Sequence, residues 1–121
     1  MKSNALKFKF MEKEVLTWLE DIIQSIDEIE LFLPEKRNFY EFQKDLKARK
    51  AIERNIEIIG EAISRMLKVH PEIRISNARK IVDTRNRIIH GYDSVSEDII
   101  WAIVSSDLIK LRQEIATFLD E

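Results

Sequence analysis

The sequence predicts an all-α protein, folded as an antiparallel bundle of four main helices. Two observations support this prediction. The 121 residues include only two Gly and two Pro, too few for the many tight turns that a sheet-rich fold of this size needs. Apolar residues also recur at the three- and four-residue spacing of amphipathic helices along almost the whole chain. A chain of this length is expected to form one domain, residues 1–121.

The first two helices are expected on either side of Pro34, because proline disfavours helical geometry in the residue before it. Asn38, with Glu41 three residues later, is typical of an N-cap that opens the second helix. Gly60, within that helix, costs about 1 kcal/mol relative to Ala, which indicates a close helix crossing. The first apolar stripe comprises Phe8, Met11, Val15, Trp18 or Leu19, Ile22, Ile26 and Ile29; the second comprises Phe42, Leu46, Ile52, Ile56, Ile59, Ile63 and Met66 or Leu67.

The third helix is expected after His70-Pro71, which closes the second. Ser76 is its candidate N-cap. The helix is predicted to end at His90, because Gly91 can take the left-handed conformation that terminates helices.

The last helix is expected to begin at Ser94, which forms a capping pair with Glu97. Its apolar stripe comprises Trp101, Val104, Leu108, Leu111, Ile115 and Leu119. Four helices with short connections favour an antiparallel bundle.

The composition excludes several classes of protein. Without Cys, the chain can form neither a disulfide framework nor a thiolate metal site. No run of 18 apolar residues and no compact apolar segment near the N-terminus is present, so neither a membrane span nor a signal peptide is indicated. The expected location is the cytoplasm.

The net charge of −2 conceals a strong asymmetry along the chain. Residues 12–35 carry eight acids and one Lys, a net −7, and residues 94–121 carry a net −4. Residues 36–50 carry a net +4, and residues 65–87 a net +5. These blocks are expected on different helices, so a basic face that contacts nucleic acid is compatible with the overall charge. Charge that merely keeps surface helices soluble would explain any single block equally well.

The third helix carries an arginine in an unexpected place. At 100° per residue, its apolar residues fall within about 60° either side of one direction, and Arg85 points along the middle of it. A guanidinium there needs an anion or an acceptor. Asn86 and His90 extend a polar strip from Arg85 to the edge of the apolar face, and Tyr92 follows Gly91. The apolar residues are Ala78, Ile81, Val82, Ile88 and Ile89.

Each of these polar residues also has a purely structural interpretation. Arg85 would pair with Glu61, which follows Gly60 in the second helix. His90 would interact with the negative end of the helix dipole. Tyr92 would bury its ring and leave its hydroxyl in water.

The alternative interpretation is phosphodiester chemistry. Histidine exchanges protons near neutral pH, and arginine binds phosphate through two nitrogens. RNA supplies its own nucleophile, the 2′-hydroxyl, so neither a protein nucleophile nor a metal or other cofactor is required. The reaction needs both a base and an acid, which a two-fold dimer would supply by bringing two Arg85/His90 pairs into one cleft.

The segment from Arg85 to Tyr92 resembles the R-x4-H-x-Y signature of ribonucleases of the HEPN superfamily, and more narrowly the HepT toxins of HepT/MntA toxin–antitoxin systems. The resemblance extends over most of the chain from about Ile52. Further matching segments are Arg54–Ala62, His70–Ile73, Ile100-Trp101 and Asp107-Leu108.

This resemblance implies a dimeric helical bundle that acts as a metal-independent endoribonuclease toxin. It implies that Arg85 and His90 are catalytic and that Asn86 is a supporting polar residue. It also implies that Tyr92 is the tyrosine to which a nucleotidyltransferase antitoxin adds adenylates, silencing the toxin.

Two other hypotheses remain open from the residues themselves. The protein could be a non-catalytic helical adaptor or a nucleotide-binding partner of a nucleotidyltransferase. It could also be a plain helical bundle in which Arg85 and His90 are sealed from solvent, with Arg85 held by Glu61.

Overall fold

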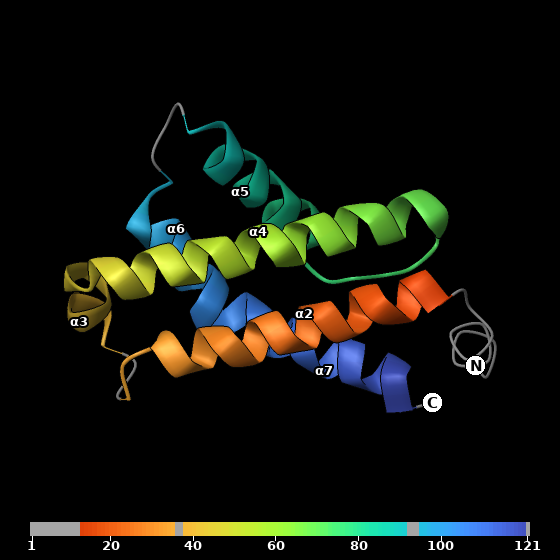
Figure 1. The fold of residues 1–121 in the computed structure, drawn as a ribbon, viewed down its shortest axis with the longest axis horizontal. Helices are drawn as coiled ribbons and strands as arrows, with labels where there is room; N and C mark the ends of the chain where they lie inside the picture. The colour runs from red at the N-terminus through yellow and green to blue at the C-terminus, as the bar shows by residue number, and fades with distance from the viewer. Residues whose placement is uncertain (1–12, 36–37, 92–94, 121) are drawn as a thin grey trace.

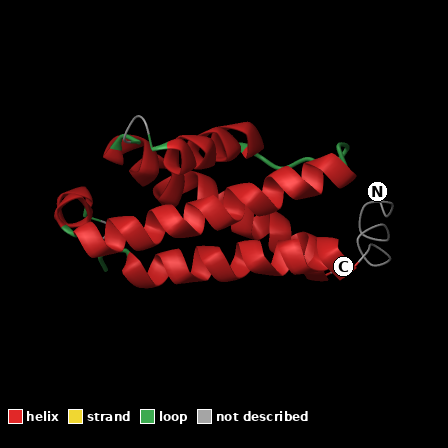
Figure 2. Cartoon of the chain, turned by 45° about the horizontal axis from the view of Figure 1, so that its top comes forward, coloured by secondary structure: helices red, strands yellow, loops and turns green. Residues whose placement is uncertain are grey.

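The computed structural model describes residues 13–35, 38–91 and 95–120, and all regular structure in these ranges is helical (Figure 2). The elements are α2 (Lys13–Phe32), α3 (Phe39–Lys44), α4 (Leu46–Val69), α5 (Ala78–His90), α6 (Glu97–Ala102), the π-helical turn η1 (Ile103–Asp107) and α7 (Leu108–Asp120). The all-α prediction is confirmed. Each of the four predicted segments is helical, but the second and the last are divided into shorter elements.

Helix α4 is the centre of the fold. It packs most extensively against α2 and α5, and α7 packs against α2 (Figure 1). Helices α2 and α4 lie side by side and run in opposite directions (Figure 1), as the antiparallel arrangement predicts. Their facing apolar stripes, with that of α7, form one core. Its largest fully buried side chains include Leu19, Ile22, Ile29, Phe42, Ile52, Ile56, Ile59, Ile63 and Met66.

The predicted apolar stripes are confirmed at most described positions and wrong at a few. Leu19 rather than Trp18, and Met66 rather than Leu67, lie in the core. Leu46 is 57% exposed, because it is the first residue of α4 and lies beyond the part that α2 covers. Leu119, near the end of α7, is also exposed. Phe8 and Met11 lie outside the described residues.

The second predicted helix is divided at Asp45. Asn38 is the N-cap of α3, and its side chain accepts a hydrogen bond from the backbone N–H of Tyr40 at 2.8 Å. Asp45 then takes an extended conformation, and its carboxylate accepts from the backbone N–H of Ala48 at 3.0 Å. Asp45 thus ends α3 and caps α4, because its side chain competes with the helical backbone for hydrogen bonds.

The prediction that Ser76 caps α5 is wrong. The Ser76 hydroxyl donates to Glu114 of α7 at 2.7 Å, and its backbone N–H donates to the same carboxylate. Asn77 takes the N-cap position, with a left-handed φ of 60° and no capping hydrogen bond from its side chain. The other end of α5 is as predicted, because Gly91 follows His90 with a φ of 66°.

The last predicted helix has Ser96 rather than Ser94 as its N-cap. The Ser96 side chain accepts from the backbone N–H of Asp98 at 3.2 Å, whereas Ser94 lies outside the described residues. Helix α6 then continues through η1 into α7. The wider turn of η1 carries Asp107, which is buried. Its carboxylate forms an ion pair with Lys80 of α5, with 2.8 Å between Oδ2 of Asp107 and Nζ of Lys80.

Two further contacts fix α6 and α7 against the rest of the bundle. Trp101 of α6 packs against Phe39 and Phe42 of α3, with ring centroids 5.7 and 5.1 Å away. Arg112 of α7 hydrogen-bonds Asp27 of α2 at 2.9 Å, and this bond, together with the charge of Asp27, raises the pKa of Arg112. None of the helices in the described ranges is both long and apolar enough to cross a membrane.

Helix α5 crosses α4 at very short range at Gly60. A Cβ atom on Gly60 would lie 2.5 Å from the Cβ and 2.8 Å from the Cγ of Arg85. The close crossing predicted from Gly60 is therefore confirmed. The apolar face predicted for α5 is confirmed at four of its five positions. Ile81 is buried, Ala78, Val82 and Ile88 are partly buried against the core, and Ile89 is 49% exposed.

Replacing Gly60 with Ala tests this crossing. Helix propensity alone would stabilise the variant by about 1 kcal/mol. The clash with atoms close to the α5 backbone outweighs that gain, so we expect G60A to lower the free energy of unfolding by about 1–3 kcal/mol. Urea denaturation measures the change, and Ser64→Ala, one turn along α4, is the control with little expected effect. A more stable G60A variant would show that α5 can shift without cost.

Candidate active site

The Arg85 side chain is held by polar groups on two helices. Its Nη2 forms an ion pair with Glu61 of α4, and its Nη1 donates to the side-chain oxygen of Asn86 at 2.6 Å. The second carboxylate oxygen of Glu61 accepts from Nε of Arg65 at 2.8 Å. The structure therefore brings Arg85 and Asn86 into direct contact and fixes the guanidinium from two sides.

The Arg85 guanidinium lies at the wall of an open cavity of about 350 Å³. The pairing with Glu61 expected from the structural interpretation is confirmed, but the side chain is 22% exposed and thus not sealed from solvent. Three arginines and three carboxylates line this cavity, so its formal charge is balanced. They are Arg54, Arg65, Arg85, Asp21, Glu57 and Glu61, with Trp18, Ile58, Ala62 and Ile89 as apolar neighbours.

His90 is the last residue of α5 and is exposed. The helical repeat places it about 140° around the axis from Arg85 and about 7.5 Å further along. Arg85 thus faces α4, whereas His90 stands on the outer side of the same helix. Tyr92, the predicted modification site, lies outside the described residues.

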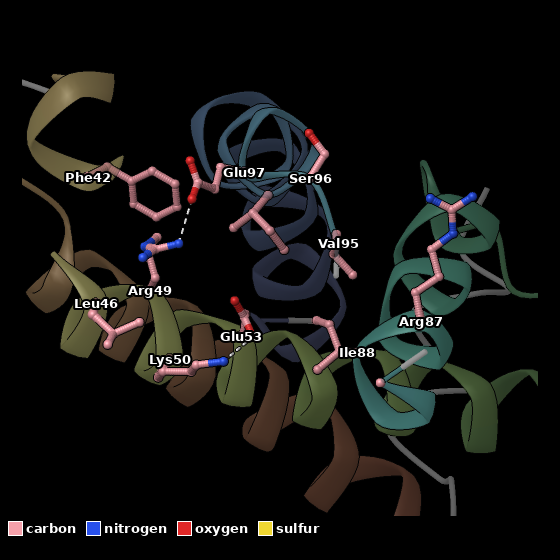
Figure 3. Close-up of a pocket in the computed structure, with 12 residues that line it drawn as sticks. Phe42, Leu46, Arg49, Lys50, Glu53, Arg87, Ile88, Val95, Ser96 and Glu97 are labelled. Carbon is pink, nitrogen blue, oxygen red and sulfur yellow. Dashed lines mark hydrogen bonds and ion pairs between the residues drawn. The ribbon is translucent and has the colours of Figure 1, made fainter. Parts of the chain in front are cut away.

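A second cavity, of about 460 Å³, lies on the other side of α5 (Figure 3). Its walls come from the start of α4, the end of α5 and the start of α6. Arg49 of α4 binds Glu97 of α6 at 2.6 Å across it, and Arg87 of α5 stands opposite Arg49 (Figure 3). No pattern in the sequence predicts this cavity, because residues from separate segments line it and no local spacing connects them.

The predicted basic face is partly neutralised by ion pairs, which involve five of the eleven described cations in residues 36–50 and 65–87. Arg49, Lys50, Arg65, Lys80 and Arg85 each have a carboxylate partner. The spacing of Glu61 and Arg65, one helical turn apart, is the signal that could have predicted one of these pairs. In the part of the chain that the structure describes, no group of three or more His, Asp or Glu side chains is placed to hold a metal ion.

Comparison with known proteins gives consistent matches. Residues 22–118 match the family model described as Ribonuclease HepT-like. A protein of Thermococcus cleftensis named probable ribonuclease HepT is 34% identical over 106 residues, which cover 84% of this chain and 93% of that protein. A candidate RNase of Methanocaldococcus jannaschii is 32% identical over 97 residues, 77% of either chain. No solved structure gives a significant match.

Removing the charge of Glu61 tests how Arg85 is held. We expect Glu61→Gln to increase the mobility of the Arg85 guanidinium, because the ion pair is lost while the side-chain volume stays the same. The free energy of unfolding should fall by less than about 1 kcal/mol, since the pair is partly exposed. The ¹⁵N heteronuclear NOE of Arg85 Nε measures the mobility, with Glu53→Gln on the same helix as the control. An unchanged NOE in E61Q would contradict this account of the contact.

Proposed function

We propose a catalytic role for this site from one premise: the chain belongs to the HepT-like ribonuclease family. In our proposal the protein is a metal-independent endoribonuclease that cleaves RNA by attack of the ribose 2′-hydroxyl. One observation carries the proposal. A positioned, partly exposed arginine at an open cavity shares a helix with an exposed histidine one and a half turns further on.

The reaction needs only groups that two copies of this helix offer, one as base and one as acid. The 2′-oxygen attacks the adjacent phosphorus, the bond from phosphorus to the 5′-oxygen breaks, and the products carry a 2′,3′-cyclic phosphate and a 5′-hydroxyl. His90 accepts the proton of the 2′-hydroxyl or donates one to the leaving 5′-oxygen. Arg85 binds the scissile phosphate and stabilises the charge that develops on its oxygens.

Glu61 and Asn86 act through Arg85 in this scheme. Asn86 accepts a hydrogen bond from Nη1 of Arg85, and Glu61 forms an ion pair with Nη2. These two contacts fix the plane of the guanidinium before RNA binds. Glu61 shares its charge with Arg65, which leaves Arg85 incompletely neutralised and able to bind a phosphate. Glu61 is thus a positioning residue, and Asn86 has the supporting role expected from the sequence.

A two-fold dimer would complete the site. Each protomer supplies one His90, whereas the reaction uses both a base and an acid. The cavity beside Arg85 has the apolar residues Trp18, Ile58 and Ile89 at its edge, and Ile89 is about half exposed. A dimer seam over these residues would bury apolar surface and bring the two Arg85/His90 pairs into one cleft.

The regulation we propose follows the family resemblance. The protein would be the toxin of a toxin–antitoxin pair, silenced when a nucleotidyltransferase antitoxin adds adenylates to Tyr92. Tyr92 is two residues from His90 in the sequence. A polyanionic adduct at this position would repel RNA and block the cleft.

Substitutions test the roles proposed for Arg85 and His90. We expect Arg85→Ala and His90→Ala each to reduce RNA cleavage at least about 1,000-fold and to relieve growth arrest, because each removes a group that acts in the transition state. His70→Ala and Arg79→Ala are the matched controls and should retain activity. Circular dichroism checks that all variants fold, and gel analysis of labelled RNA measures the rates.

The cleavage products, the activity of the variants and their binding discriminate between the remaining hypotheses. A 3′-hydroxyl end, in place of a cyclic phosphate, would refute the 2′-hydroxyl mechanism alone. Retained cleavage and toxicity in both R85A and H90A would refute the assignment of the site. RNA or nucleotidyltransferase binding without turnover, unaffected by H90A, would favour the non-catalytic adaptor.

The proposed dimer is tested at Ile89. We expect Ile89→Asp to convert the dimer to a monomer and to reduce RNA cleavage, because the charge would be buried unpaired in the seam. Light scattering after size-exclusion chromatography measures the mass. Ile109→Asp, on α7 and with a comparable exposure of 44% against 49%, is the control that should stay dimeric. A dimeric, active I89D variant would place the seam elsewhere.

A further inference from the structure

The second cavity has features of a nucleotide-binding site, and neither Arg85 nor His90 lines it. We propose that the cleft between α4, α5 and α6 binds one nucleotide of the RNA strand, next to the scissile bond, with Arg87 contacting its phosphate. This inference rests on the proposed ribonuclease function and specifies where the substrate lies.

The charges in the cleft favour a single phosphate. Arg49 is paired with Glu97 at 2.6 Å, and Lys50 with Glu53 at 3.8 Å, so the two carboxylates that would repel an anion are neutralised. The Arg87 side chain is exposed and has no hydrogen-bond or ion-pair partner among the described residues. It is therefore the cation in the cleft that an incoming phosphate can bind without breaking an existing contact.

The walls of the cleft suit the rest of a nucleotide. Ile88 and Val95, both partly exposed, supply apolar surface (Figure 3), and Phe42 and Ile100 line the cleft with almost fully buried side chains. Proteins that bind single strands combine such surface for the base with cations for the backbone. The volume, about 460 Å³, lies in the range of small-molecule pockets.

The place of the cleft on α5 connects it to the proposed chemistry. Arg87, Ile88 and Gly91 all line it, and Gly91 directly follows His90. A nucleotide in the cleft would thus lie beside the histidine, while Arg85 faces a separate cavity across the helix. A strand that passes the end of α5 would have one phosphate near Arg85 and His90 and a neighbouring nucleotide in the cleft.

Binding measurements test the role of Arg87 separately from catalysis. All variants are made in a His90→Ala background, and the probe is a short, fluorescein-labelled single-stranded oligoribonucleotide. We expect Arg87→Ala to weaken binding about tenfold and to reduce the salt slope by about one, with Arg87→Lys intermediate. Arg79→Ala is the matched control, since Arg79 is also exposed and lies two turns away on α5, and it should change affinity less than about twofold.

A steric variant tests the shape of the cleft. Leu46, exposed at one end of it, is replaced by Trp, which should weaken binding by obstructing the opening. Val69→Trp, at the opposite end of α4 and 44% exposed, should have no effect. Equal losses in R87A and R79A would indicate diffuse attraction and overturn the proposal, as would unchanged binding in R87A and L46W. Absence of cleavage by the unmodified protein would instead refute the proposed function, whatever the binding results.

Discussion

The contact of Gly60 with Arg85 is the constraint on which the rest of the site depends. With no side chain on Gly60, α5 approaches α4 until the Cβ of Arg85 occupies the space that a side chain would take. The Arg85 guanidinium then lies at the surface of α4, where it forms an ion pair with Glu61. A charged residue can therefore lie at the centre of a helix contact, because its stem packs against α4 while its head keeps both a carboxylate partner and access to solvent.

Helix α5 is held by its packing against α4 and by polar contacts at its start. At its start, Asn77 hydrogen-bonds Asp107 at 3.3 Å, and Lys80 pairs with the same carboxylate. The π-helical turn η1 places this buried aspartate, and such turns are frequent at functional positions. Few apolar side chains of α5 are buried, so cavities lie on both sides of the helix, one beside Arg85 and the other beside Arg87. The weak coverage of α5 is thus what exposes its polar residues to a ligand.

The electrostatic character of the protein is local rather than global. Five of the eleven described cations of the two basic segments are paired with carboxylates from other helices or from about one turn away, as Arg49 is with Glu97 and Arg65 with Glu61. Pairing reduces the long-range field, and exposed pairs contribute little stability. The cations without a carboxylate partner include Arg87, which lines the second cavity and can bind an individual phosphate there.

The sequence by itself determined the helical class, the C-terminal ends of α2 and α5, and Gly60 as a crossing point, because periodicity, Pro34 and Gly91 act through local backbone geometry. It also identified Arg85, Asn86 and His90 as candidates by their spacing on one helix. It could not predict that Ser76 bonds Glu114 instead of capping α5, or that Arg87 faces Arg49 and Glu97 across a cleft. Only the tertiary structure decided these arrangements, because they bring together residues from separate helices, such as Ser76 and Glu114, which are 38 residues apart.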